Sequence, residues 1–191
     1  MVGFEDEVWW SRFALPSLNA WSADGEPARL VQRSVPKDDP DPKAISCYGL
    51  YLPELGGETW LRFVDGRPVS GITTGFLSWC SEKLLAALGK RVLVLVWDNA
   101  SWHKSKEVRR WIGAHTRRVK KSGQGVRIIG CLLPKQSPWL NPIEPKWIHG
   151  KRRVVKADGG PLGAHELAER VCAAFFGCPH YEHLSLAEKV A

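Results

Sequence analysis

The sequence predicts a mixed α/β fold of one domain, in which antiparallel strands precede parallel strands and helices flank the sheet. The chain has 191 residues, of which 44% are hydrophobic and 25% charged, a composition typical of one globular domain. An unbroken apolar run, Val92–Trp97, indicates a strand that is covered on both faces, as in the parallel part of a sheet. Strand patterns come first along the chain and then alternate with helical patterns, which favours sheet and helix layers.

Short hydrophobic stretches separated by turn residues predict the strands of the first part. The N-terminal stretch is rich in Phe, Val and Trp, although it contains three consecutive acids at positions 5–7. The polar, proline-rich region that follows should hold one short strand and a loop at Pro36–Pro42. The turn at 53–57 joins two further strands as a hairpin. The expected strands are Gly3–Phe13, Ala28–Ser34, Ala44–Leu52 and Thr59–Val64.

Helical periodicity dominates the second part of the chain. The first helix should begin after an N-cap at Thr73 or Thr74 and stop at Gly89. A second helix should run from about Ser105, with its arginines facing away from the core. The remaining expected elements are buried strands at Val92–Trp97 and Val126–Leu133, a helix that opens at Asn141-Pro142 and a last helix from His165 to Phe176.

Positive charge is concentrated in one part of the chain. Residues 1–100 hold 10 Lys/Arg against 13 Asp/Glu, a balance of −3, whereas residues 101–156 hold 15 against 2, a balance of +13. A concentrated basic region attracts polyanions such as DNA through counterion release, although a solvated helix surface has the same pattern. The basic segment therefore makes nucleic acid the first candidate partner.

Neither a membrane span nor a secretion signal is visible. No stretch approaches the roughly 18 consecutive apolar residues of a membrane span, and the first ten residues lack the basic-then-apolar pattern of a signal peptide. The five cysteines form no CxxC pair, which favours reduced thiols. We therefore expect a cytoplasmic protein that does not bind membranes.

Asp98 and Glu144 stand at places where a carboxylate can be directed into a site. Asp98 ends the most hydrophobic strand, and the carboxyl ends of such strands collect catalytic groups in open α/β sheets. Asp98-Asn99 is also suited to an ordinary strand-to-helix turn. Glu144 completes a capping box with Asn141 as the N-cap and Pro142 at the first helical position. That capping role is a sufficient explanation of Glu144 and is also compatible with a fixed, functional carboxylate.

The acids of the N-terminal strand need a partner. Strand alternation places Asp6 on one face and Glu5 and Glu7 on the other. An acid held against a covered face requires a compensating group, and a divalent metal would provide it. Carboxylates from Asp6, Asp98 and Glu144 would suit hard cations, Mg²⁺ or Mn²⁺, in a two-ion site for phosphodiester chemistry.

Two long motifs and one short motif resemble a known family. Residues 98–105 (DNASWHKS) and 133–147 (LPKQSPWLNPIEPKW) resemble the DNA-x-x-H-K-S and LP-x-x-SP-x-LNPIE-x-x-W signatures of DDE transposases in the mariner-like group of bacterial insertion sequences. Residues 4–7 resemble that family's first catalytic strand, where the aspartate is followed by glutamate. The spacing between Asp98 and Glu144 is long for the group, and we assign the added residues to an elongated loop at Lys120–Gly125.

The resemblance implies an RNase H-like fold and a metal-binding triad of Asp6, Asp98 and Glu144. It also implies that a Mg²⁺ pair cuts DNA at transposon ends, that the freed 3′-hydroxyl attacks target DNA, and that the active form is a homodimer at the nucleoid. The family's N-terminal helix-turn-helix region does not precede Asp6 here, so a separately encoded helix-turn-helix half is an expected partner. The alternatives are a catalytically inactive, transposon-derived DNA-binding module and another RNase H-like nuclease.

Residues near the three acids are candidates for DNA contacts. Basic side chains position phosphates, and exposed aromatic rings stack on bases. For each of them the simpler interpretation is a solvated surface cation, a core aromatic residue or, for the histidine, a residue that caps or packs at a helix start. The candidates are Asn99, Trp102, His103, Lys104, Arg109, Arg110, Trp139, Lys146, Lys151, Arg152 and Arg153.

Overall fold

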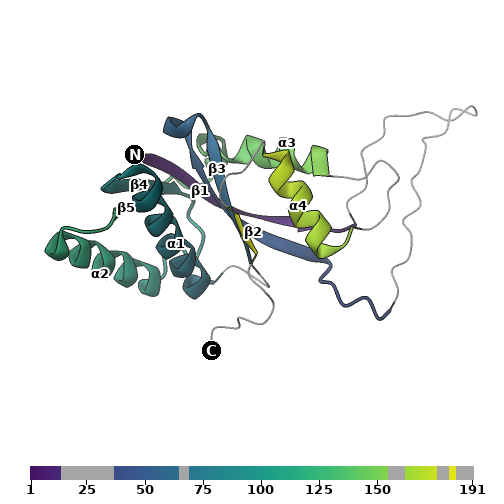
Figure 1. Ribbon diagram of the computed structural model, residues 1–191, viewed down its shortest axis with the longest axis horizontal. Helices are drawn as coiled ribbons and strands as arrows, with labels where there is room; N and C mark the ends of the chain where they lie inside the picture. Colours follow the sequence, from purple (N-terminus) through teal and green to yellow (C-terminus); the bar gives the residue numbers. More distant parts are fainter. Residues whose placement is uncertain (14–36, 65–68, 155–161, 176–180, 184–191) are drawn as a thin grey trace, which may run out of the picture.

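A six-stranded mixed sheet lies between two pairs of helices (Figure 1). The computed structural model describes residues 1–13, 37–64, 69–154, 162–175 and 181–183. Its strands are β1 (Val2–Ser11), β2 (Ala44–Leu52), β3 (Glu58–Val64), β4 (Val92–Trp97), β5 (Arg127–Leu132) and β6 (Tyr181–His183). Their order in the sheet is β5-β4-β1-β2-β3-β6. The pairs β1–β2 and β2–β3 are antiparallel, whereas β1–β4, β4–β5 and β3–β6 are parallel, which confirms the predicted mixed sheet.

The helices divide between the two faces of this sheet. They are α1 (Ser70–Leu88), α2 (Lys106–Ser122), α3 (Glu144–Val154) and α4 (Ala164–Ala174), with short 3-10 turns η1 (Pro53–Leu55) and η2 (Pro138–Leu140). Figure 1 shows α1 and α2 on one side and α3 and α4 on the other. Within the described ranges, no helix is both long and apolar enough to cross a membrane.

Each face of the sheet has its own hydrophobic core, because side chains alternate along the central strands. Tyr48, Leu50 and Leu52 of β2 pack with α1 and α2. Cys47 of the same strand packs with Val8 of β1, α3 and α4. The middle of β1 and β2 is therefore buried on both sides, so that polar side chains at positions 5–7 of β1 lie between sheet and helices.

The helix boundaries differ from prediction in α1, α2 and α3, and α3 begins at Glu144 rather than at Asn141-Pro142. α1 begins at Ser70 rather than after Thr73, because the hydroxyl of Thr73 donates to the Val69 carbonyl at 3.1 Å and sits inside the helix. α2 begins where predicted, after Ser105, whose Oγ caps the helix by accepting from the Val108 amide. It then continues to Ser122 and ends at Gly123, with φ of 69°. Of Lys120–Gly125, the first three residues therefore form the last turn of α2, and only residues 123–125 belong to the connection to β5.

Two predictions about strands were incomplete. β5 forms an edge of the sheet and is largely exposed rather than buried, with Ile129 and Leu132 each 49% exposed. β6 was not predicted, because three residues carry no periodic pattern and the strand exists only through its pairing with β3. The strand expected at Ala28–Ser34 lies outside the described residues.

One indole ring joins α3 to the sheet. Asp6 of β1 and Gly49 of β2 are directly opposite each other. Trp147 lies on the bare backbone of Gly49, so that an added Cβ would be 2.7 Å from Trp147 Cζ2. The same ring donates from Nε1 to Asp6 Oδ2 at 2.8 Å. The close approach at Gly49 thus sets how α3 is seated above β1.

We expect Gly49→Ala to lower the free energy of unfolding by about 1–3 kcal/mol, because the methyl group would overpack the contact with Trp147. Urea-induced unfolding measures this change. Gly75→Ala is the matched control, since an added Cβ inside α1 meets nothing nearer than Arg62 Nη1 at 3.7 Å, and alanine should stabilise that helix by up to about 1 kcal/mol. Equal stability of wild type and Gly49→Ala would contradict the proposed packing.

Candidate functional site

The three consecutive acids of β1 point to opposite faces, as strand alternation predicts. Asp6 faces α3, where it accepts from Trp147. Glu5 and Glu7 face the other side and lie beside His103. All three are largely buried: Glu5 is fully buried and Asp6 is 9% exposed. The strand therefore carries carboxyl groups on both sides in the centre of the sheet.

Asp6 lies in an environment that favours its neutral form when no cation is bound. Burial, followed by the charges of Glu144 and Glu5, raises the pKa of Asp6 to about 8, and the hydrogen bond from Trp147 only partly opposes this. A carboxyl group in this condition is compensated either by a proton or by a cation. The group therefore fits the chemistry of a metal ligand.

Asp98 follows β4, at the carboxyl end of the strand that runs parallel to β1. Its Oδ1 accepts from the Ala100 amide at 2.7 Å and lies 2.9 Å from His103 Nδ1. The hydrogen bond with His103 is the main reason why the pKa of Asp98 lies below its usual range. Asp98 thus forms the ordinary strand-to-helix turn that the sequence also suggested, and its carboxylate is still half-exposed.

Glu144 is the first residue of α3, but the predicted capping box is not formed. The Asn141 side chain is buried and donates to the Glu5 carbonyl at 3.3 Å instead of capping the helix. The Glu144 amide donates to the Asn141 carbonyl at 3.1 Å. Asn141 therefore ties the loop before α3 to β1, and this contact holds the start of the helix beside Asp6.

Carboxyl groups from β1, from the residue after β4 and from the start of α3 lie near one another at the carboxyl end of β4. Asp98 and Glu144 line one pocket of about 310 Å³, which the loop at 133–138 and Asn141 complete. Burial and the charge of Asp98 raise the pKa of Glu144. The charge of Glu144 in turn raises the pKa of Asp6. Each of the three predicted acids therefore interacts electrostatically with at least one of the others. All the candidate ligand atoms are oxygens, the type that Mg²⁺ and Mn²⁺ prefer.

His103 occupies a different place from the one that the sequence suggested. Only 2% of it is exposed, and both ring nitrogens face carboxylates, Asp98 on one side and Glu5 and Glu7 on the other. Burial lowers its pKa, but the carboxylates outweigh that effect and raise the pKa of His103 to about 12. The ring has no surface left for a phosphate, so the expected DNA contact is corrected to a buried contact inside the site.

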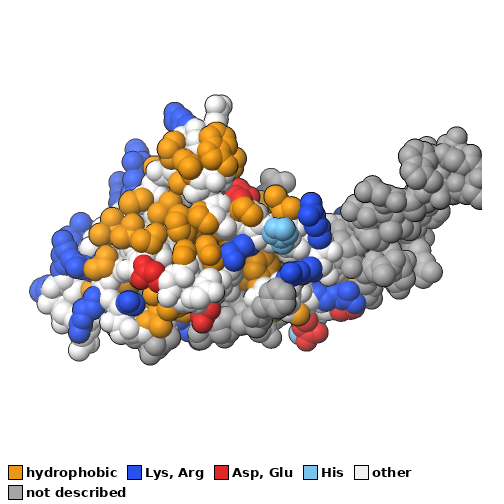
Figure 2. Space-filling view, turned by 90° about the horizontal axis from the view of Figure 1, so that it is seen from above, with side chains coloured by type: hydrophobic (Ala, Val, Ile, Leu, Met, Phe, Trp, Pro, Cys, Tyr) orange, Lys and Arg blue, Asp and Glu red, His pale blue; other side chains and the backbone are white. Residues whose placement is uncertain are grey.

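The other DNA-contact candidates fall into two groups, those whose side chains contact other parts of the protein and those that are exposed to solvent. Asn99 donates to the Leu133 carbonyl, Trp102 donates from Nε1 to Glu7 at 2.7 Å, and Lys146 lies 4.2 Å from the centre of the Tyr51 ring. Trp139 is 75% exposed, and Figure 2 shows Lys and Arg side chains gathered at the end of the molecule formed by α2. The exposed basic candidates are Lys104, Arg109, Arg110, Lys151, Arg152 and Arg153.

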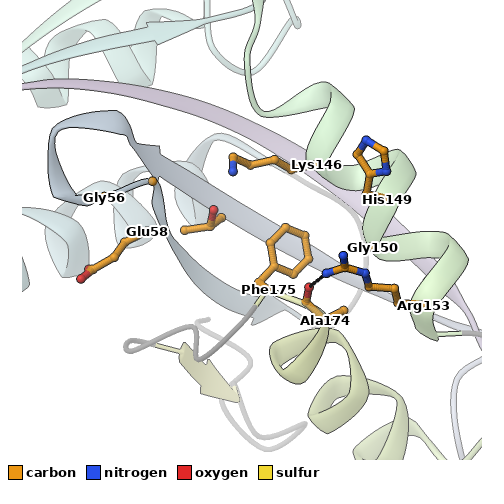
Figure 3. Close-up of a pocket in the computed structure, with 10 residues that line it drawn as sticks. Gly56, Glu58, Lys146, His149, Gly150, Arg153, Ala174 and Phe175 are labelled. Atoms are coloured by element: carbon orange, nitrogen blue, oxygen red, sulfur yellow. Dashed lines mark hydrogen bonds between the residues drawn. The ribbon is translucent and has the colours of Figure 1, made fainter.

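A second pocket, of about 490 Å³, lies between α3, the end of α4 and the turn before β3. Figure 3 shows Lys146 and Arg153 extending from α3 over it, with the Phe175 ring below and Glu58 pointing away. His149 also lines the pocket and was missed from the sequence. Its spacing of three residues from Lys146 and four from Arg153, which puts all three on one side of a helix, was the available signal.

Comparisons with known proteins agree with this fold. The profile of a family described as DDE superfamily endonuclease matches residues 4–158. A solved pre-cleavage Mos1 transpososome superimposes with a TM-score of 0.61 at 11% identity, and a mariner Mos1 paired end complex with Mg with 0.59 at 16%; each match covers 93% of this chain and 52% of the other. A simian T-cell lymphotropic virus intasome matches with 0.54 at 12%, over 97% and 50%. No curated protein matches significantly.

These likenesses confirm the predicted RNase H-like class of fold. The chain spans about half the length of the solved proteins that it matches.

The raised pKa of Asp6 predicts a specific pH dependence of stability in the metal-free protein. Because the folded state binds this proton more tightly, with a pKa of about 8 against 3.8, the contribution of Asp6 is greatest below the lower value and is lost as pH rises towards the higher one. Relative to that of Asp6→Asn, the free energy of unfolding of wild type should fall by on the order of a few kcal/mol between about pH 4 and about pH 8.

Urea unfolding in the presence of a chelator, at several pH values, measures this difference. Asp38→Asn is the control, because Asp38 is exposed and its replacement should leave the pH profile parallel to that of wild type. A parallel profile for Asp6→Asn would show that Asp6 is ionised in the folded protein without a cation.

Proposed function

Because the chain belongs to the DDE superfamily of endonucleases, we propose that it is the catalytic domain of a transposase that cuts DNA at insertion-sequence ends and joins it to a target. The family match spans all three acids, and the fold is that of proteins solved as transposase complexes. The observation that carries the proposal is the meeting of buried or half-buried carboxylates from β1, β4 and α3 at one edge of the sheet.

In this proposal Asp6, Asp98 and Glu144 are the catalytic residues and hold Mg²⁺ or Mn²⁺, as a pair of ions. Their crowded, all-oxygen arrangement supports such ligation, because a cation would relieve the conditions that raise the pKa values of Asp6 and Glu144. When bound, the ions would activate the attacking oxygen and stabilise the leaving oxygen of a phosphodiester. The chain's part is to fix the carboxylates: Trp147 holds Asp6, and the turn to Ala100 holds Asp98.

We infer that DNA lies across the pocket of Asp98 and Glu144 and along basic surfaces beside it. Exposed arginines on α2 and basic side chains of α3 would contact phosphates. Lys146 supports a contact at the second pocket, since its ammonium group is partly buried and its pKa is lowered by burial. A negatively charged phosphate there would compensate the Lys146 ammonium group for the hydration that burial removes. Trp139, at the rim of the first pocket's loop, is the candidate for base stacking.

The assembly around this domain is also a proposal. Residues 1–191 form one catalytic domain, which would act as a homodimer on DNA at the nucleoid in the cytoplasm. End recognition would come from a helix-turn-helix half encoded separately or read by frameshifting. The matching chain of the paired end complex is about twice as long as this one, since the match covers 52% of it. This likeness supports a larger assembly.

We expect Asp98→Asn and Glu144→Gln each to reduce Mg²⁺- or Mn²⁺-dependent nicking of DNA that carries the element's terminal repeats by about 100-fold or more, because each removes a charged ligand. Gel analysis of end-labelled duplexes measures the rate, and a chelator should abolish nicking by wild type. Glu107→Gln, an exposed acid at the start of α2, is the control and should keep the wild-type rate. Undiminished nicking by Asp98→Asn would sink the proposed mechanism.

Removing the arginines of α2 should weaken DNA binding in a salt-dependent way. The double change Arg109→Ala and Arg110→Ala should lower the slope of log affinity against log salt by roughly 1 for each phosphate that the protein no longer neutralises. Fluorescence anisotropy with a labelled duplex at several salt concentrations gives this slope. Arg91→Ala, an exposed arginine outside the basic segment, should leave it unchanged. The same slope in the double variant and in wild type would exclude this surface from the DNA interface.

A further inference from the structure

Two of the three acids on β1 have no part in the proposed metal site. Glu5 and Glu7 are buried on the face opposite Asp6, with side-chain exposures of 0% and 4%. Buried carboxylates are costly unless they hold something in place. The group that they face is His103, whose side chain is also fully buried.

The imidazole of His103 bridges these acids to Asp98. Nδ1 lies 2.9 Å from Asp98 Oδ1, and Nε2 lies 3.1 Å from Glu7 Oε1 and 3.2 Å from Glu5 Oε2. The ring also stacks on Trp97, with 4.5 Å between the ring centres. Contacts at both nitrogens and on one ring face leave His103 a single orientation.

This orientation determines which oxygen of Asp98 is available. The hydrogen bonds from His103 and from the Ala100 amide both end on Oδ1. Oδ2 is the oxygen that they leave for another ligand, and Asp98 lines the pocket that it shares with Glu144. Ligating carboxylates are commonly oriented by such outer hydrogen bonds, whose loss typically weakens metal affinity or activity by about 10- to 100-fold.

We propose that His103 is a positioning residue for the metal site: Glu5 and Glu7 anchor its ring from behind, and the ring holds Asp98 with Oδ2 directed towards the shared pocket. This inference rests on the proposed function, because it takes Asp98 as a metal ligand. It gives the acidic triplet of β1 two separate tasks, with Asp6 as a ligand on one face and its two neighbours as an anchor on the other.

The competing explanation is that Glu5, Glu7 and His103 themselves bind a metal ion, since their ligand atoms lie within 4.8 Å of one another. The hydrogen bond between Nε2 and Glu7 Oε1 at 3.1 Å favours the anchor, with Glu5 Oε2 in a charge contact at 3.2 Å and without a hydrogen bond of its own. Two histidine replacements separate the functions of the two ring nitrogens. The amide nitrogen of Asn lies near the position of Nδ1, and that of Gln lies near the position of Nε2.

The experiment measures the affinity of the full chain for Mn²⁺ by electron paramagnetic resonance of the free ion, and the Mg²⁺ concentration that gives half-maximal nicking. His103→Gln and His103→Ala should weaken Mn²⁺ binding and raise the required Mg²⁺ by about 10- to 100-fold. His103→Asn should stay within about threefold of wild type, because it keeps the donor to Asp98. Thermal unfolding without metal shows whether each variant is folded, and the comparison of Asn with Gln does not depend on the alanine variant.

His115→Asn is the matched control, because His115 is a buried histidine of α2 that contacts the Val126 carbonyl away from the acids. It should leave Mn²⁺ affinity unchanged. Equal affinity in His103→Asn and His103→Gln would overturn the inference, as would Mn²⁺ binding that survives Asp98→Asn but is lost in Glu7→Gln. If Asp98→Asn nicks DNA normally, the proposed function fails instead, so the two failures are distinguishable.

Discussion

The seat of Trp147 on Gly49 is the constraint on which the arrangement of this protein depends. The absence of a side chain at Gly49 lets the indole lie on the β2 backbone, and the register of β1 and β2 puts Asp6 within reach of its Nε1. Because α3 begins with Glu144, the contact that fixes the position of Trp147 also fixes the position of that carboxylate. One packing contact therefore fixes a helix, a strand and two of the three candidate ligands relative to one another.

β1 is the second organising element, because it is buried on both faces and yet carries three acids. A strand in this position would ordinarily be apolar, since a buried charge needs a partner. Here each face supplies one: Trp147 donates a hydrogen bond to Asp6, while His103 lies against Glu5 and Glu7. The free-energy cost of burying these groups is the physical reason to expect a cation at this edge.

Much of the fold was predictable because hydrophobic periodicity is local. The hairpin of β2 and β3, the apolar strand β4 and the start of α2 after Ser105 follow from residues close together in the sequence. Two of the errors arose where distant contacts decide. Asn141 leaves the capping box to reach the Glu5 carbonyl, and β5 is exposed because it is the outermost strand of the sheet. Thr73 is a local error, since its hydroxyl donates to the Val69 carbonyl four residues earlier, inside α1.

The sequence by itself determined the mixed sheet, the order of its elements, the family and the identity of the three candidate acids, since these follow from periodicity and from contiguous motifs. Only the tertiary structure decided what surrounds each acid. The positions of His103, Glu5 and Glu7 around Asp98 depend on contacts between residues 96 and 98 positions apart, which no local pattern encodes. For that reason a histidine that the sequence suggested as a DNA contact is found buried behind the metal-site candidate Asp98.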